Sequence, residues 1–377
     1  MPFIEVSKML LKQEFVRLAT NEKNNFSKLC QTYNISRQSG YKWLNRYQAQ
    51  GESGLLELSR RAQNSPMATA PVVIDFIVKT RINHPCWGAK KIQRILQNNA
   101  FDGVPSPVTI HKILQKNNLI CPELSAQSKP IQRFEYSQPN ELWQMDFKGD
   151  FPIAPGLRCH PLTILDDHSR FSLCVGSCAN QKRITVEQQL KKTFHQYGLP
   201  QRFLIDNGSP WATVETENRL TKLSVWLIEL GIKVIFCRPR RPQTKGKDER
   251  FNRTLKDEVI SKYSIRSLRH AQDLFESWRE IYNGQRPHQA LNYDTPSQHY
   301  AISSRKFYDK IEPVEYESSD IVKRVDARGC ISHKTARIFV GRAFTSKQVA
   351  LRKFPDQLGF NVFFYSQIIK KIDSKPL

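Results

Sequence analysis

The chain has 377 residues, with 58 Lys and Arg against 35 Asp and Glu, a formal net charge of +23 and a pI near 9.7. With 39% hydrophobic residues it can bury sizeable cores, which excludes disorder of the whole chain. No apolar run reaches membrane-spanning length, and the eight cysteines form neither a CxxC pair nor a zinc-ligand pattern. We therefore expect a cytoplasmic, multidomain protein that has no disulfides and does not bind membranes. Its excess positive charge is expected to bind a polyanion.

Helical periodicity dominates the first 60 residues. Apolar positions predict helices over 6–18, 26–33 and 37–50, the order of a helix-turn-helix DNA-binding domain at 1–60. The predicted inner stripe of the third helix is Gly40, Trp43, Leu44 and Tyr47. The opposite face presents side chains that suit a DNA major groove, namely Gln38, Lys42, Asn45 and the flanking Arg46. The alternative is a solvated face on an ordinary three-helix bundle.

A second basic helical domain is predicted over residues 67–120, with helices at 71–81, 89–98 and 108–117. Ser106 is the expected N-cap of its third helix and Pro107 the first helical residue. The outer face of that helix presents three further candidate DNA contacts, Thr109, Lys112 and Lys116. Residues 121–140, with three prolines and no clear period, are predicted to be a linker.

From residue 141 the hydrophobic period changes from 3.6 to 2. Three strands, at 142–148, 161–166 and 171–176, precede a helix at 185–197 and a strand at 202–206. A helix near 218–230, a strand at 233–237 and helices at 246–262 and 268–282 complete the order expected of an α/β RNase H-like core at 141–300. Short β-rich runs at 320–377 predict a small all-β, SH3-like barrel.

Three acidic residues of this core are candidates for chemistry. Asp146 points away from the apolar face of its strand, and Asp206 ends a strand just before Asn207-Gly208. Glu249 shares a polar helix stripe with Arg253 and Lys256. Taken singly, each has a plainer explanation, a turn-forming Asp or a solvated helix with an ion pair.

Several sequence blocks of the core, taken together, resemble the bacterial insertion-sequence transposases related to retroviral integrases, the DDE recombinases. The matching blocks are LWQMDFKG at 142–149, LDDHSR at 165–170, DNG at 206–208, PQTKGKDERF at 242–251 with TLK at 254–256, and YN with RPH at 282–288. The helical domains before the core and the β-domain after it are also familiar in that family. The 42 residues between Asp206 and Glu249 exceed the spacing of many relatives, and the surplus is placed at 211–220.

The resemblance implies that Asp146, Asp206 and Glu249 form a catalytic, metal-binding triad. It implies two Mg²⁺ ions, for which Mn²⁺ substitutes, and an endonuclease and strand-transfer activity that frees 3′-hydroxyls at element ends and joins them to target DNA. The expected partner is double-stranded DNA, on which the chain assembles as a homo-oligomer close to the nucleoid. Bases around the triad are expected to hold phosphates, namely Lys245, Lys247, Arg253 and Lys256.

Two alternatives to this function remain open: a catalytically silent DNA-binding regulator of the element, and an RNase H-like nuclease. The adjacent Asp166 and Asp167 are interpreted as a hairpin turn and not as an extension of the metal site. Cys174 and Cys178 are interpreted as core thiols.

Overall fold

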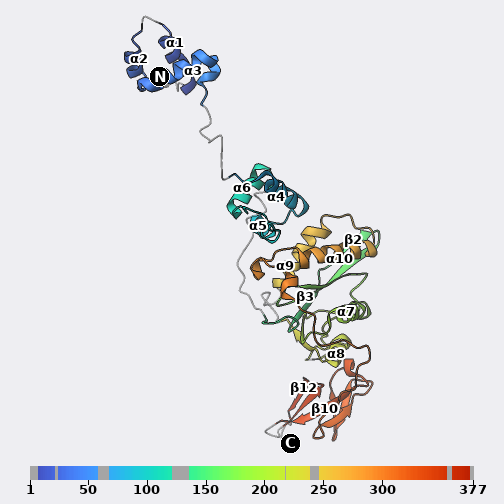
Figure 1. Ribbon diagram of the computed structural model, residues 1–377. Helices are drawn as coiled ribbons and strands as arrows, with labels where there is room; N and C mark the ends of the chain where they lie inside the picture. The colour runs from blue at the N-terminus through green and yellow to red at the C-terminus, as the bar shows by residue number, and fades with distance from the viewer. Residues whose placement is uncertain are drawn as a thin grey trace, which may run out of the picture. The chain divides into compact units, whose positions relative to one another are not determined.

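The computed structural model describes residues 7–21, 24–57, 68–120, 136–216, 218–237, 246–354 and 359–373. The chain divides into two compact units, Met1–Ala68 and Thr69–Leu377 (Figure 1). No helix of the described ranges combines the length and the apolar character that a bilayer crossing requires.

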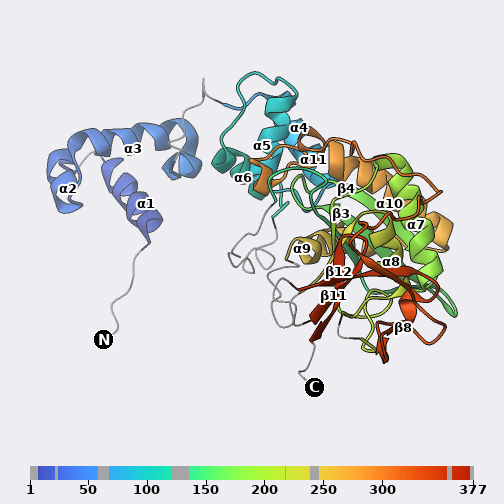
Figure 2. The same ribbon diagram turned by 90° about the horizontal axis from the view of Figure 1, so that it is seen from below.

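The first unit contains three helices, α1 (Lys8–Ala19), α2 (Phe26–Thr32) and α3 (Arg37–Gln50), followed by a 3₁₀ turn at Gly51–Leu55 (Figure 2). The side chain of Ser36 accepts a hydrogen bond from the Ser39 amide and so begins α3 at the predicted residue. Gly40 permits close packing, since a Cβ there would lie 2.7 Å from the Cys30 sulfur. The predicted inner stripe of α3 is wrong at Tyr47, which is 36% exposed.

The second unit begins with another helical domain, made of α4 (Pro71–Asn83), α5 (Ala89–Asn98) and α6 (Pro107–Lys116). Its core is fully buried at Ile77, Ile92 and Ile110. The Ser106 side chain accepts from the Thr109 amide, and Pro107 is the first residue of α6, as predicted. Residues 121–135 of the predicted linker lie outside the described residues.

A six-stranded mixed sheet forms the centre of the second unit. Its strands are β1 (Trp143–Phe147), β2 (Phe151–Ala154), β3 (Leu157–Asp166), β4 (Ser172–Cys178), β5 (Arg202–Ile205) and β6 (Lys233–Phe236). The order is β2-β3-β1-β5-β6, with β4 paired to β3. β1 pairs parallel with β5 and β5 with β6, whereas β1 and β4 run antiparallel to β3.

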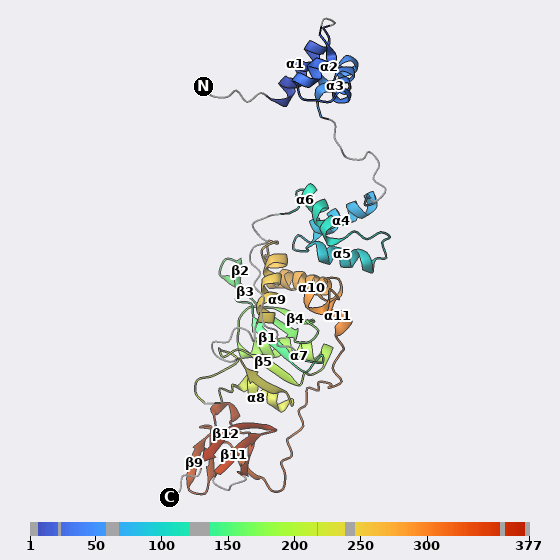
Figure 3. The ribbon, with the colours of Figure 1, turned by 90° about the vertical axis from the view of Figure 1, so that its left-hand side faces the viewer.

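Helices cover both faces of this sheet (Figure 3). One face packs on α7 (Arg183–Tyr197) and α8 (Lys222–Glu229). The other packs on α9 (Gly246–Leu255) and α10 (Leu268–Gly284), after which the short α11 (Pro296–His299) follows. The predicted helix 246–262 is divided, because Lys256–Ile260 forms a π-helical turn after α9.

The C-terminal β-domain contains two sheets. β7 (Ile321–Arg324), β10 (Gln348–Lys353), β11 (Gly359–Phe364) and β12 (Gln367–Asp373) form one sheet in the order β12-β11-β10-β7. β8 (Cys330–His333) and β9 (Ala336–Phe339) pair as a separate hairpin. The SH3-like barrel is not confirmed, because the two sheets are not closed on each other.

Candidate active site

Asp146 in β1 and Asp206, which directly follows β5, occupy corresponding positions at neighbouring parallel strands. In the register of β1 and β5, Trp143 pairs with Phe203 and Gln144 with Leu204. Each acid lies three residues beyond the first of these pairs, so both reach the same end of the sheet. Both are partly exposed, whereas the alternate residues Trp143 and Met145 are fully buried in the core beside α7.

Helix α9 lies against β1 and carries the third acid. Asn252, buried on α9, donates a hydrogen bond from its Nδ2 to the Asp146 Oδ2 over 3.5 Å. The Asn252 Oδ1 is buried and has no hydrogen-bond partner among the described residues. Glu249 precedes Asn252 by three residues and is exposed. The face of α9 that packs on the core carries Phe251 and Leu255, as predicted.

The three acids are not gathered into a ready cluster. Across the described ranges, no group of three or more His, Cys, Asp or Glu side chains is placed so that it could hold a metal ion. The structure therefore brings Asp146 and Asp206 to one end of the sheet and places Glu249 on the helix beside β1. The three carboxylates would have to move closer together to bind the same metal ions.

A buried carboxylate, Asp167, fastens α9 to the sheet. Its Oδ1 accepts from the Gln144 Nε2 at 2.5 Å and from the Lys247 Nζ at 2.6 Å. Its Oδ2 accepts from the Tyr136 amide at 2.9 Å. Asp167 is fully buried and Lys247 is 16% exposed, so the ammonium compensates a charge inside the protein.

Asp166 and Asp167 lie in the hairpin between β3 and β4, as predicted. The Asp166 Oδ1 accepts from the Ser169 hydroxyl at 2.6 Å and the Ser169 amide at 2.8 Å, and its Oδ2 accepts from the Asn140 amide at 2.7 Å. Burial raises the pKa of Asp166, while the hydrogen bonds from Ser169 oppose the increase. The end of the predicted linker is thus tied to the core at Asn140.

The candidate DNA contacts of the first unit differ in whether their side chains already make contacts within the domain. Gln38, Lys42 and Asn45 are exposed on α3. Arg46 donates to the Leu56 carbonyl at 2.7 Å and lies over the Trp43 ring, 4.9 Å from its centroid. Arg46 therefore has a role inside the domain.

The other predicted contacts that the structure describes lie on α6, on α9 and at the start of the π-helical turn after α9. Lys112, Lys116, Arg253 and Lys256 are exposed, whereas the Thr109 hydroxyl lies 3.0 Å from the Ser106 hydroxyl at the helix cap. Lys247 binds Asp167 as described above. Lys245 lies outside the described residues.

Sequence reasoning missed the residues that hold this site together, Asn252, Asp167 and Gln144. A signal for Asn252 was available, because a spacing of three from Glu249 places both side chains on neighbouring parts of one helix surface. The partners of Asp167 have no local signature, since Gln144 and Lys247 are 23 and 80 residues away.

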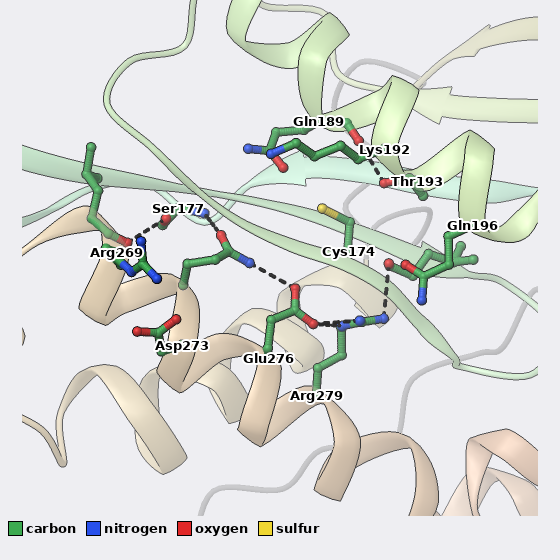
Figure 4. A pocket seen from close by; sticks show the side chains of 13 residues that line it. Cys174, Ser177, Gln189, Lys192, Thr193, Gln196, Arg269, Asp273, Glu276 and Arg279 are labelled. Atoms are coloured by element: carbon green, nitrogen blue, oxygen red, sulfur yellow. Dashed lines mark hydrogen bonds and ion pairs between the residues drawn. The ribbon is translucent and has the colours of Figure 1, made fainter.

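A separate pocket of about 530 Å³ lies between β4, α7 and α10 (Figure 4). Its lining includes Gln189, Lys192 and an ion pair between Arg279 and Glu276 at 2.6 Å. Burial raises the pKa of the Cys174 thiol in its wall to about 11, which fits the predicted core thiol. None of the three candidate acids lines this pocket.

Comparison with known families agrees with this architecture. The family described as integrase core domain matches residues 136–242 and 230–296. Helix-turn-helix and homeodomain-like domains match 11–62 and 39–114, and the family described as IS481 family transposase, C-terminal domain, matches 320–376. These matches support a bacterial insertion-sequence transposase of the DDE recombinase and integrase superfamily.

Individual proteins are similar to part of the chain. The uncharacterized 31.7 kDa protein of insertion element IS407 from Burkholderia multivorans is 28% identical over 160 residues, 42% of this chain and 55% of the relative. The 39.2 kDa protein of IS476 from Xanthomonas euvesicatoria is 29% identical over 162 residues, 43% and 44% of the two chains. The transposase for transposon Tn552 from Staphylococcus aureus is 24% identical over 263 residues, 62% and 52%. The chain thus spans about half the length of these relatives.

Proposed function

We propose that the protein is a DNA transposase that binds the ends of its mobile element, cleaves DNA to free 3′-hydroxyls and joins them to target DNA. One observation carries the proposal. Asp146 and Asp206 reach the same end of the sheet on adjacent parallel strands, and α9, which carries Glu249, is linked to Asp146 through Asn252.

The donor set fits a hard divalent cation. Carboxylates are the ligands that Mg²⁺ prefers, and the unpartnered Asn252 Oδ1 adds a polar oxygen beside Asp146. Asp146, Asp206 and Glu249 would hold two Mg²⁺ or Mn²⁺ ions. When bound, such ions stabilise the charge that develops on the attacking and leaving oxygens of phosphodiester cleavage.

The residues of the chain position the acids and the DNA. The Asn252 amide orients the Asp146 carboxylate, because it holds one of its two oxygens. Arg253 on α9 and Lys256, the first residue of the π-helical turn after it, are exposed and would hold phosphates of the DNA end. Lys247 acts differently, since its ammonium binds Asp167 and so fixes the start of α9 against the sheet.

DNA recognition is assigned to the two helical domains. The exposed Gln38 and Asn45 on α3 carry amides that can read base edges, and Lys112 and Lys116 on α6 carry charges for phosphates. The expected partners are the terminal inverted repeats and target DNA, with assembly of several copies on the DNA.

The test uses a labelled duplex from the DNA that flanks the coding region, a target plasmid and Mg²⁺. Joined product from the wild-type chain, none from Asp206→Asn, and none in excess chelator would support the proposal. Bound but uncut DNA would indicate a regulator, and degradation of an RNA–DNA hybrid would indicate a nuclease. Ca²⁺ should permit binding without cleavage, because it takes more ligands in a looser geometry.

A further inference from the structure

Between β5 and α8, residues 206–216 and 218–221 form a loop that is held by its own hydrogen bonds. The amides of Trp211 and Ala212 donate to the Gly208 carbonyl at 2.9 and 3.0 Å. The Thr213 amide donates to the Arg219 carbonyl at 2.9 Å, and Ala212 bridges to Leu220. The loop therefore folds back on itself directly after Asp206.

The C-terminal β-domain sits on this loop and on α8. The Asn218 Nδ2 donates to the Ile369 carbonyl of β12 at 2.8 Å, and Lys347 forms an ion pair with Glu229 at the end of α8. The methyl group of Thr216 packs on Gly341 so closely that a Cβ there would lie 3.1 Å from it.

One hydrophobic cluster runs through this contact. It contains Trp211 and Leu220 of the loop together with Phe344 and Ile369 of the β-domain, all of them buried. Figure 3 shows α8 on the side of the core from which β11 and β12 follow. The β-domain and the loop are thus parts of one packed body.

Residues of the same loop contact the neighbours of the first two acids. The Arg219 Nη1 donates to the Asn207 Oδ1 at 3.0 Å, and the Asn207 Nδ2 donates to the Cys237 carbonyl at 2.7 Å. The Trp211 ring lies 5.6 Å, centroid to centroid, from Phe147, the neighbour of Asp146. A displacement of the loop would therefore also move Asn207, the residue next to Asp206.

We propose that the enlarged loop is a docking surface for the C-terminal β-domain, and that this docking positions Asp206 at the end of β5. A loop bears an entropic cost of ordering, and the contacts with Ile369, Gly341 and the shared apolar cluster offset it. The catalytic consequence rests on the proposed transposase function. The ordering of the described loop residues, 207–216 and 218–220, by the β-domain is independent of that function.

A bulky substitution in the contact between the loop and the β-domain tests whether this contact orders the loop. Thr216→Arg places a large charged side chain against Gly341, and Val214→Arg puts the same side chain at a fully exposed position of the same loop. Hydrogen exchange of the 208–220 amides, measured in the full chain, should be ~10-fold faster in Thr216→Arg and unchanged in Val214→Arg. The Mn²⁺ concentration for half-maximal cleavage should rise several-fold, with the rate restored at saturating Mn²⁺.

A charge swap gives a second readout. Glu229→Lys should speed exchange in the loop, and the double variant Glu229→Lys with Lys347→Glu should restore it. Unchanged exchange in both Thr216→Arg and Glu229→Lys would overturn the docking role. Faster exchange with an unaltered Mn²⁺ midpoint would overturn the positioning of Asp206. A wild-type chain that cuts no DNA, but shows the expected exchange pattern, would instead contradict the proposed function alone.

Discussion

Asn252 and Asp146 join helix α9 to strand β1 through a side-chain hydrogen bond of 3.5 Å between Nδ2 and Oδ2. Because Asn252 lies one helical turn after Glu249, this contact also sets where the third acid lies along the sheet. A buried amide here is suited to a carboxylate that must remain ionised, since an N–H donor stabilises the charged form.

Removal of the Asn252 side chain should therefore impair catalysis more than folding. Asn252→Ala is expected to lower the free energy of unfolding by about 1 kcal/mol, and to lower the cleavage rate ~10-fold or more, the size of a lost positioning contact. Thr254→Ala on the same helix serves as the control, because its exposed hydroxyl donates to the Arg250 carbonyl within the same helix. Equal rates for the two variants would argue against the role of Asn252.

Glu249→Gln should abolish strand cleavage and joining while DNA binding stays nearly intact, because it removes a ligand charge and preserves the helix. Asp146→Asn and Asp206→Asn should behave alike, and combining the changes should add little, since the three residues act as a unit. Glu280→Gln, on an exposed face of α10, is the control. Wild-type joining by Glu249→Gln would remove Glu249 from the triad.

Substitutions of Lys247 and Lys256 should affect different properties, protein stability for Lys247 and DNA binding for Lys256. Lys247→Met leaves the buried Asp167 carboxylate without its cation and should cost about 3 kcal/mol of stability, part of which Lys247→Met with Asp167→Asn recovers. Lys256→Met should leave stability unchanged. It should lower the slope of log K for DNA binding against log salt concentration by about one unit, the value for one lost phosphate contact. Denaturant unfolding and binding titrations at several salt concentrations check both statements.

The amides on α3 should determine sequence preference. Gln38→Ala or Asn45→Ala is expected to cost about 1 to 3 kcal/mol on the element end and little on random DNA. Titrations on specific and scrambled duplexes measure this difference. If both duplexes weaken equally, the first domain is an electrostatic anchor and the reader lies on α6.

Lys91 on α5 gives the stability a pH dependence. Burial, together with Arg286 and Arg250 and against the opposing effect of Glu258, lowers the pKa of Lys91 to about 7. Above that pH Lys91 loses its proton in the folded chain and keeps it in the unfolded chain, so the free energy of unfolding rises with pH. Below that pH Lys91 is charged in both states, and the full cost of burying its charge lowers the stability. Relative to Lys91→Met, wild-type stability should increase by about 2 kcal/mol from pH 6.5 to 8.5. The exposed neighbour variant Lys90→Met should follow the wild type.

Local patterns were sufficient for much of the fold. The predicted range 37–50 matches α3, and the alternation in β1 correctly separates Asp146 from the buried Met145. Strand β2 was missed although the equally short β5 and β6 were predicted, because Pro152 within the segment weakens its strand signal. The expected barrel is not confirmed, since the same strand signals allow two open sheets as well as closure. The role of Lys247 could not be predicted, because Asp167 is its partner only in the folded chain.

The buried Asp167 also has a consequence for the order of folding. Its partners Gln144, Tyr136 and Lys247 lie 23, 31 and 80 residues away, so each contact closes a long loop before it contributes any stability. A carboxylate without a cation is costly inside a protein, which delays complete burial of the hairpin until Lys247 arrives. Because Lys247 precedes Glu249 by only two residues, the late step that neutralises Asp167 also brings the third acid to the sheet. The site would thus be assembled only in chains whose core has already formed.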